Sequence, residues 1–133
     1  MIYGKGSKGN YPRLSNLAKK TPIFPKISNS RSMLHIDNLS EFLVQVILKN
    51  RKGVYFPQNE EYVNTSELVK LIGYTDGKKV WLTPLFNPII RLFFGLDTVK
   101  KVFGNLVYEK EMSRYDFEYQ VIDFEESIKN TEL

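Results

Sequence analysis

Few side chains in this sequence could serve as a nucleophile, a general base or a metal ligand. His35 is the only histidine, and cysteine is absent. These counts exclude thiolate metal sites, a cysteine nucleophile and any site that needs two histidines. A serine nucleophile in a Gly-x-Ser-x-Gly segment is also absent. Because His35 lies between Leu34 and Ile36 in a predicted short strand, we interpret it as a structural residue, and we predict no catalytic residue and no metal site.

A glycine-rich run near the N-terminus imitates a dinucleotide-binding loop. Gly4, Gly6 and Gly9 match the Gly-x-Gly-x-x-Gly pattern, in which backbone amides approach a pyrophosphate. That loop requires a buried strand before it and an acidic residue about 20 positions later. Only Met1 to Tyr3 precede the run, and Ser28-Asn29-Ser30 occupies the later position. We therefore interpret the match as accidental and predict no cofactor-binding residue in this chain.

Positive charge is concentrated at one end of the chain. The net charge is +4, but the segment before Asp37 holds seven basic residues and no acidic one: Lys5, Lys8, Arg13, Lys19, Lys20, Lys26 and Arg31. This asymmetry favours an anionic partner such as a nucleotide diphosphate, a nucleic acid or an acidic protein surface. The alternative is a solvated basic face. Arg31, between two serines, is either a bidentate phosphate ligand or a surface residue.

The pattern of apolar residues predicts a mixture of helices and short strands in one domain, residues 1–133. Predicted helix N-caps are Asn10, Asp37, Asn64, Asp97 and Asp123. The helices cover 11–20, 39–50, 65–73, 84–96 (broken at Pro88) and the stretch from Asp97 to Gly104, with a last helix after Asp123. The strands or extended segments cover 21–27, 33–36, 54–57, 80–82 and 105–108. This order predicts an α/β (α+β-like) small domain without a complete doubly wound sheet.

The most apolar stretch does not predict a membrane span. Leu82 to Leu96 is interrupted by prolines and Arg91 and falls short of the ~20 residues that a membrane helix needs. The N-terminus also lacks the apolar core of a secretory signal. Together with the absence of cysteine, these features lead us to expect a cytoplasmic protein without a membrane partner.

Six short segments of the chain, taken in their order along the sequence, carry a resemblance to a known protein family. They are Ile2–Gly6 (IYGKG), Gly9–Leu14 (GNYPRL), Arg31–Leu39 (RSMLHIDNL), Thr65–Leu68 (TSEL), Gly104–Leu106 (GNL) and Asp123–Ile128 (DFEESI). The ordered set resembles the C-terminal portion of the extended short-chain dehydrogenase/reductases. UDP-galactose 4-epimerase and other NAD-dependent nucleotide-sugar epimerases and dehydratases belong to this family.

The resemblance implies a C-terminal, substrate-binding lobe that lacks the N-terminal Rossmann half. It implies that Asn10 and Arg31 bind the phosphates of a UDP-sugar, that Pro22 and Phe24 flank the base through their backbone, and that Lys100 or Lys101 contacts the diphosphate. NAD would belong to the full-length parent and not to this chain. The catalytic Tyr-x-x-x-Lys pair of the family is missing, since the match of Tyr74 with Lys78 falls in a turn.

The favoured function is therefore the nucleotide-sugar-binding lobe of a UDP-sugar 4-epimerase, which is not catalytic alone. A 4-keto-sugar reductase or dehydratase of the same family is an alternative. A basic module that binds nucleic acid through residues 1–31 is a less favoured one. A further possibility is self-association through the apolar segment Leu85 to Phe94.

Overall fold

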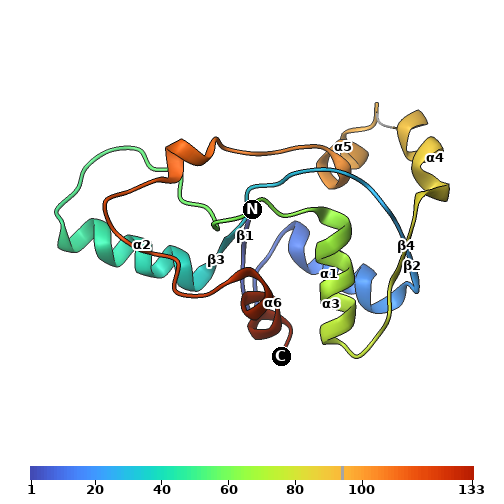
Figure 1. Ribbon diagram of the computed structural model, residues 1–133, viewed down its shortest axis with the longest axis horizontal. Coiled ribbons are helices and arrows are strands. Elements are labelled where there is room, and N and C mark those ends of the chain that lie inside the picture. The colour runs from blue at the N-terminus through green and yellow to red at the C-terminus, as the bar shows by residue number, and fades with distance from the viewer. Residues whose placement is uncertain (94) are drawn as a thin grey trace.

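The computed structural model describes residues 1–93 and 95–133 of the chain, and for Thr98 only the backbone. Helices alternate with short strands, as the sequence predicts, and the molecule is elongated, with α2 at one end and α4 at the other (Figure 1). The elements in chain order are β1 (Ile2–Tyr3), α1 (Asn10–Lys20), β2 (Ile23–Pro25), β3 (Leu34–His35), α2 (Ile36–Leu48), α3 (Thr65–Thr75), β4 (Trp81–Thr83), the 3₁₀-helix η1 (Pro84–Phe86), α4 (Asn87–Leu92), α5 (Asp97–Phe103), the 3₁₀-helix η2 (Lys110–Ser113) and α6 (Phe124–Glu132).

The strands form two separate pairs, and both pairs are parallel. β1 pairs with β3, so that Tyr3 lies opposite His35, and β2 pairs with β4, so that Phe24 lies opposite Leu82. Two neighbouring parallel strands need a long crossover connection between them. The connection from β1 to β3 contains α1 and β2, and the connection from β2 to β4 contains β3, α2 and α3. Within the described residues there is no larger sheet, so the small mixed α/β class is confirmed and a complete Rossmann sheet is not seen there.

The main core lies between β1, α1, α3 and α6. Leu68, Val69 and Ile72 of α3 are fully buried, and they pack with Tyr3 of β1 and Ile128 of α6. A second cluster fixes α2 to the loops that follow it. Its buried members are Leu34, Phe42 and Tyr119, and several aromatic rings surround them: Tyr55, Tyr115 and Phe117.

Two of the five predicted helix caps are confirmed. Asn64 Oδ1 accepts hydrogen bonds from the backbone N–H groups of Ser66 and Glu67, and Asp123 Oδ1 accepts one from Glu126. The prediction for Asp37 is wrong: α2 begins at Ile36, and the Nδ1 atom of His35 accepts the hydrogen bond from the Asp37 N–H at 3.3 Å. The prediction for Asp97 is wrong as well, because Asp97 is the first residue of α5 (Asp97–Phe103) and Leu96 holds the N-cap position.

Asn10 is also not a cap. It is the first residue of α1, and Gly9 holds the N-cap position with a φ of 98°, a backbone conformation that favours glycine. The N-cap of α1 therefore makes no side-chain hydrogen bond to the helix.

Further corrections concern where elements start and stop. The predicted strand 54–57 does not form, because Val54 is exposed and Tyr55 packs against the ring of Phe42. α3 does not end at Gly73 but continues to Thr75. A Cβ at position 73 would lie 2.5 Å from Val80 Cγ2, so glycine at this position allows the helix to pack closely against Val80. Gly73 therefore serves packing and does not stop the helix.

The segment predicted as one helix over 84–96 is shorter and divided. It consists of η1 and α4, and Pro88 lies in the first turn of α4 without breaking it. Phe94 lies outside the described residues. Among those that are described, no helix is both long enough and apolar enough to cross a bilayer.

Candidate functional site

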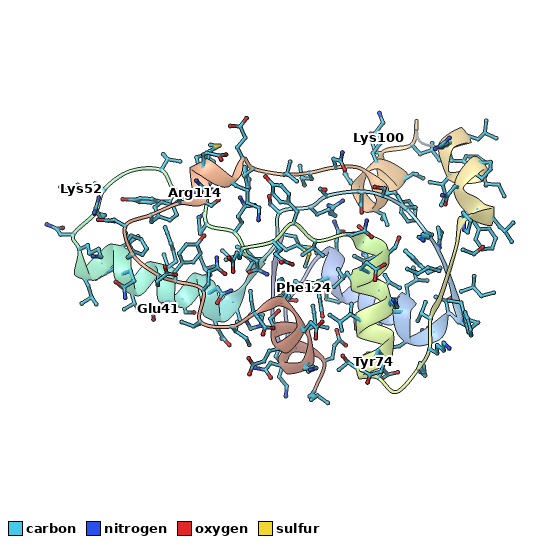
Figure 2. The ribbon with its side chains drawn as sticks, in the orientation of Figure 1. Glu41, Lys52, Tyr74, Lys100, Arg114 and Phe124 are labelled. Carbon is cyan, nitrogen blue, oxygen red and sulfur yellow. The ribbon has the colours of Figure 1, made fainter. Side chains whose placement is uncertain are left out.

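A cleft of about 980 Å³ lies between the end of β2 and the elements α3, α4 and α5. Figure 2 shows Lys100 projecting from α5 at the end of the molecule that also carries α4. Residues from four separate segments line the cleft: Lys26, Ile27 and Ser28, then Asn64, Ser66 and Glu67, then Pro84, Asn87, Ile90 and Arg91, and finally Lys100, Phe103, Gly104 and Asn105. Its size lies within the usual range for a site that takes a small organic ligand.

The charged side chains of the cleft are mostly positive. Lys26, Arg91 and Lys100 are exposed and form no ion pair with the described residues, and Glu67 is the one lining carboxylate. Glu67 itself lies 3.6 Å from the ammonium group of Lys70. Cations gathered in a concave site attract an anionic ligand more strongly than the same cations on a flat surface.

Part of the polar lining is already engaged within the protein. Ser66 Oγ donates to the carbonyl oxygen of Pro25, and Asn64 Nδ2 donates to that of Ile27. Asn105 is different, because its Oδ1 accepts from the Ser30 N–H while its Nδ2 group donates to none of the described residues. Asn87 Oδ1 is buried and likewise unpartnered in the described part of the chain. Asn105 therefore keeps a donor for a ligand.

Arg31 and Phe24 lie beneath the cleft lining. Arg31 is only 6% exposed, and one nitrogen of its guanidinium donates to the carbonyl oxygens of Gly104 at 3.2 Å and Val102 at 3.5 Å. Burial lowers the pKa of Arg31 below its usual value. Phe24 is buried with its ring 6.0 Å from that of Phe103. Both residues thus support the end of α5, which forms one wall of the cleft.

The structure separates the residues that the sequence predicted as ligands of a UDP-sugar. Lys100 lines the cleft, whereas its neighbour Lys101, Asn10 and Pro22 are exposed and do not line it. The carbonyl of Pro22 accepts a hydrogen bond from the Trp81 N–H at 2.8 Å. Their contacts with a ligand stay predictions.

Lys26, Asn87, Arg91 and Asn105 line the cleft but were not singled out from the sequence. The sequence did contain a signal that could have identified Lys26, because this residue belongs to the N-terminal segment that holds basic residues and no acidic one.

The first glycine of the glycine run packs closely against α2. A Cβ on Gly4 would lie 2.5 Å from Ile36 Cγ2, so the close approach at this glycine is to a side chain of α2. His35 is equally committed to the fold: it is buried, its Nδ1 caps α2, and its Nε2 lies 3.4 Å from Thr131 Oγ1. No group of three potential metal-ligating side chains occurs in residues 1–93 and 95–133.

A second cleft of about 920 Å³ lies between α3 and β4. It shares Lys26 with the first cleft, and its other three lysines are already engaged. Lys78 pairs with Asp76 at 2.9 Å, Lys70 pairs with Glu67, and the Lys79 ammonium lies 4.1 Å from the centre of the Trp81 ring. For this reason the first cleft is the better candidate for an anionic ligand.

Comparison with known proteins adds no relative: no family model, no curated protein and no solved structure matches this chain. Its function must therefore be inferred from its own residues and their arrangement.

Proposed function

We propose that this chain binds a nucleotide sugar, of the UDP-sugar type, as the substrate lobe of an NAD-dependent epimerase or dehydratase. The observation that carries the proposal is the cleft described above, with Lys26, Arg91 and Lys100 around it and Asn105 offering an amide donor. A nucleoside diphosphate sugar combines two negative phosphates with many hydroxyl groups. Cations and amide side chains are the groups that recognise such a ligand.

The surface of α2 supports the idea that this lobe works with a second domain. Ile47 and Leu48 are each 75% exposed, and Leu43 and Val44 on the same helix are about half exposed. α2 directly follows β3, which belongs to a parallel pair of only two strands. Parallel sheets are stable when helices cover both faces, so a larger parallel sheet packed beside β1 and β3 would cover this apolar surface. A Rossmann half provides such a sheet.

In this proposal the chain supplies binding and not chemistry. The Rossmann half would hold NAD, which carries hydride to and from the sugar, and would supply the tyrosine and lysine of the family. The groups of this chain orient the diphosphate and leave the sugar at the domain boundary. Alone, the chain forms one wall of the complete site, and we expect an affinity for UDP-glucose no tighter than about millimolar, and no turnover when NAD is added.

Two neighbouring lysines provide a matched test. Lys100 lines the cleft and Lys101 does not, although both are exposed on α5. Lys100→Gln should weaken the binding of UDP-glucose several-fold, because it removes a cation from a concave site, while Lys101→Gln should leave it nearly unchanged. Two-dimensional NMR titration measures both affinities and identifies the amides that respond, which should include Asn105 and Arg91.

Three results would contradict the proposal: equal losses for the two lysine variants, responding amides confined to other surfaces, or no response at UDP-glucose concentrations far above the millimolar range. Tight, salt-sensitive binding of single-stranded nucleic acid without any response to UDP-glucose would support the basic-module alternative instead.

A further inference from the structure

The second cleft runs along the outer edge of β4. Val80, Trp81 and Leu82 are consecutive in the sequence, and all three line it. Because successive side chains of a strand point to opposite faces of a sheet, a cleft that meets three in a row lies along the edge of the strand and not over one face. β2 occupies one edge of β4, so the cleft follows the other. α3 forms the opposite wall and contributes Tyr74, and Phe124 at the start of α6 completes the lining (Figure 2).

The backbone along this outer edge has no partner in the described part of the chain. The Trp81 N–H donates to the Pro22 carbonyl and the Thr83 carbonyl accepts from the Lys26 N–H, both at 2.8 Å, so these two residues of β4 turn their backbone toward β2. Backbone groups alternate in direction along a strand, and Leu82, between them, turns its N–H and C=O away from β2. Neither group forms a hydrogen bond with another described residue. Such an edge is a template for a further strand.

The outer edge of β2 is a poorer template. Pro25 lies on it and has no N–H to donate. The carbonyl oxygen of Ile23 on the same edge already accepts a hydrogen bond from the Thr21 hydroxyl at 2.8 Å. By contrast, the extended stretch from Lys78 to Thr83 contains no proline. Of the two edges of the β2–β4 pair, the β4 edge is therefore the one that can be extended.

The side chains of the cleft combine an apolar floor with an excess of positive charge. Buried and half-buried apolar side chains form the floor: Leu71, Val80, Leu82 and Phe124. More lysines than glutamates line the cleft, namely Lys26, Lys70, Lys78 and Lys79 against Glu67 and Glu125. Trp81 points to the face of β4 opposite Leu82, and the ammonium group of Lys79 lies over its ring. An incoming strand would therefore meet apolar groups on one face and a cation on the other.

We propose that the cleft takes an extended peptide of a partner protein as a third strand beside β4, and that apolar and acidic residues alternate in this peptide. Its backbone would form hydrogen bonds with the N–H and C=O of Leu82, and main-chain bonds of this kind supply the affinity when a strand is added to a sheet edge. Every second side chain would lie on the apolar floor, and the acidic ones between them would lie on the side of Trp81 and Lys79. The proposal does not depend on nucleotide-sugar binding, although the two clefts share Lys26 and Glu67.

The charges favour an acidic peptide over a second copy of the chain. In a symmetric dimer through the β4 edge, the same cleft of both copies would meet around a two-fold axis. Each copy would bring the same excess of lysines over glutamates to the contact, and like charges brought together oppose association. A peptide with acidic residues offers the opposite charge at the same edge.

The test is an NMR titration of the chain with a blocked peptide of about eight residues, a usual strand length, in which valine and glutamate alternate. The amide signal of Leu82 should shift, and its hydrogen exchange should slow about tenfold or more at saturation. A peptide with lysine in place of glutamate should bind about tenfold more weakly or worse. Lys79→Glu should weaken the binding of the glutamate peptide several-fold. The matched control is Lys101→Glu on α5, an exposed lysine that lines neither cleft, and it should leave the binding nearly unchanged.

Peptides that lack backbone donors test the added strand itself and leave the protein unchanged. One peptide carries an N-methyl group on every valine and another on every glutamate, so that one of the two loses the N–H groups that face Leu82 and should no longer bind. The proposal is overturned if both methylated peptides bind as the original peptide does, if the Leu82 amide does not respond, if the lysine peptide binds equally well, or if the two lysine variants lose affinity equally. A dimer in sedimentation whose Leu82 amide is protected without peptide would also overturn it, because a second copy would then cover the edge.

Discussion

Polar side chains in the interior bind one another, whereas the basic side chains around the cleft have no charged partner among the described residues. In the interior, Asn38 Oδ1 accepts from the N–H groups of Val121 and Ile122, and its Nδ2 donates to Gln120 Oε1 and to the Ile122 carbonyl. Around the cleft, Lys26, Arg91 and Lys100 form no ion pair with the described residues.

This difference indicates where function belongs in the molecule. Tyr3, His35 and Asn59 have the chemical types of an active site, but Asn59 accepts from the His35 N–H and donates to the Tyr3 hydroxyl, which also pairs with Ser127. Burial raises the pKa of Tyr3, so its hydroxyl stays protonated. A network whose members are satisfied by one another stabilises one arrangement of the chain. The cations of the cleft have no such task and remain available for a ligand.

The largest expected effect is the loss of an interior amide. Asn38→Ala should lower the free energy of unfolding by about 3 kcal/mol, because it removes a fully buried amide and with it the hydrogen bonds to the N–H and carbonyl groups of Ile122, the Val121 N–H and the Gln120 side chain. Urea denaturation measures this change. The control is Asn16→Ala on the exposed side of α1, which should cost no more than about 0.5 kcal/mol. Similar costs for the two variants would mean that the network does not stabilise the interior.

Arg31 joins the two regions, and its substitution should have a smaller and more local effect. Arg31→Lys keeps the charge but loses the planar group that reaches Val102 and Gly104. We expect a loss of about 1 to 2 kcal/mol and faster amide hydrogen exchange in α5 than in α3. Exchange that rises equally in both helices would contradict this local role.

The same variant tests the predicted diphosphate contact of Arg31. In the proposed two-domain enzyme, Arg31→Lys should weaken the binding of a UDP-sugar several-fold if the guanidinium contacts phosphate. Unchanged affinity together with faster exchange in α5 would leave Arg31 with a structural role alone.

Local signals in the sequence predicted much of the secondary structure. The apolar spacing of α1, α3 and α6 and the caps at Asn64 and Asp123 depend on residues within one or two turns of each other. Two of the failures involve partners outside the element itself. Gly73 faces Val80 across a turn, and Tyr55 packs on Phe42, which left no strand at 54–57.

The cleft was harder to predict than the helices because it gathers four segments between Lys26 and Asn105. Lys100 was singled out through its position in the family resemblance, whereas Arg91 was noted only as an interruption of an apolar run. A cation becomes a candidate ligand when the fold turns it toward a concave surface, and that orientation depends on tertiary packing.

The smallest expected effect is a pH dependence that belongs to the interior alone. Burial lowers the pKa of His35, although the nearby carboxylate of Asp37 opposes the shift. Its ring also borders Tyr3 and Thr131, and neither of these is charged near neutral pH. Protonation of Nδ1 would remove the acceptor that caps α2 and place a positive charge at a helix N-terminus.

Because the folded state binds this proton less readily than the unfolded state, the stabilising contribution is complete above the unfolded pKa of about 6.5. It is lost as the pH falls through the folded pKa, with a slope of at most about 1.4 kcal/mol for each pH unit. Urea denaturation between pH 7.5 and 5.5 measures this change in stability. The range lies above the titration of Glu132: burial alone would raise the pKa of Glu132, but its hydrogen bonds and the Lys19 ammonium hold that pKa below its ordinary value. His35→Asn retains a capping oxygen and should remove the part of the slope that His35 contributes. The Met1 ammonium, whose pKa burial also lowers, should keep its own contribution in this variant. Because His35 caps α2 and makes no contact with α5, amide exchange in α5 should change less with pH than exchange in α2. A slope that is unchanged in the His35→Asn variant would assign the pH dependence to other groups.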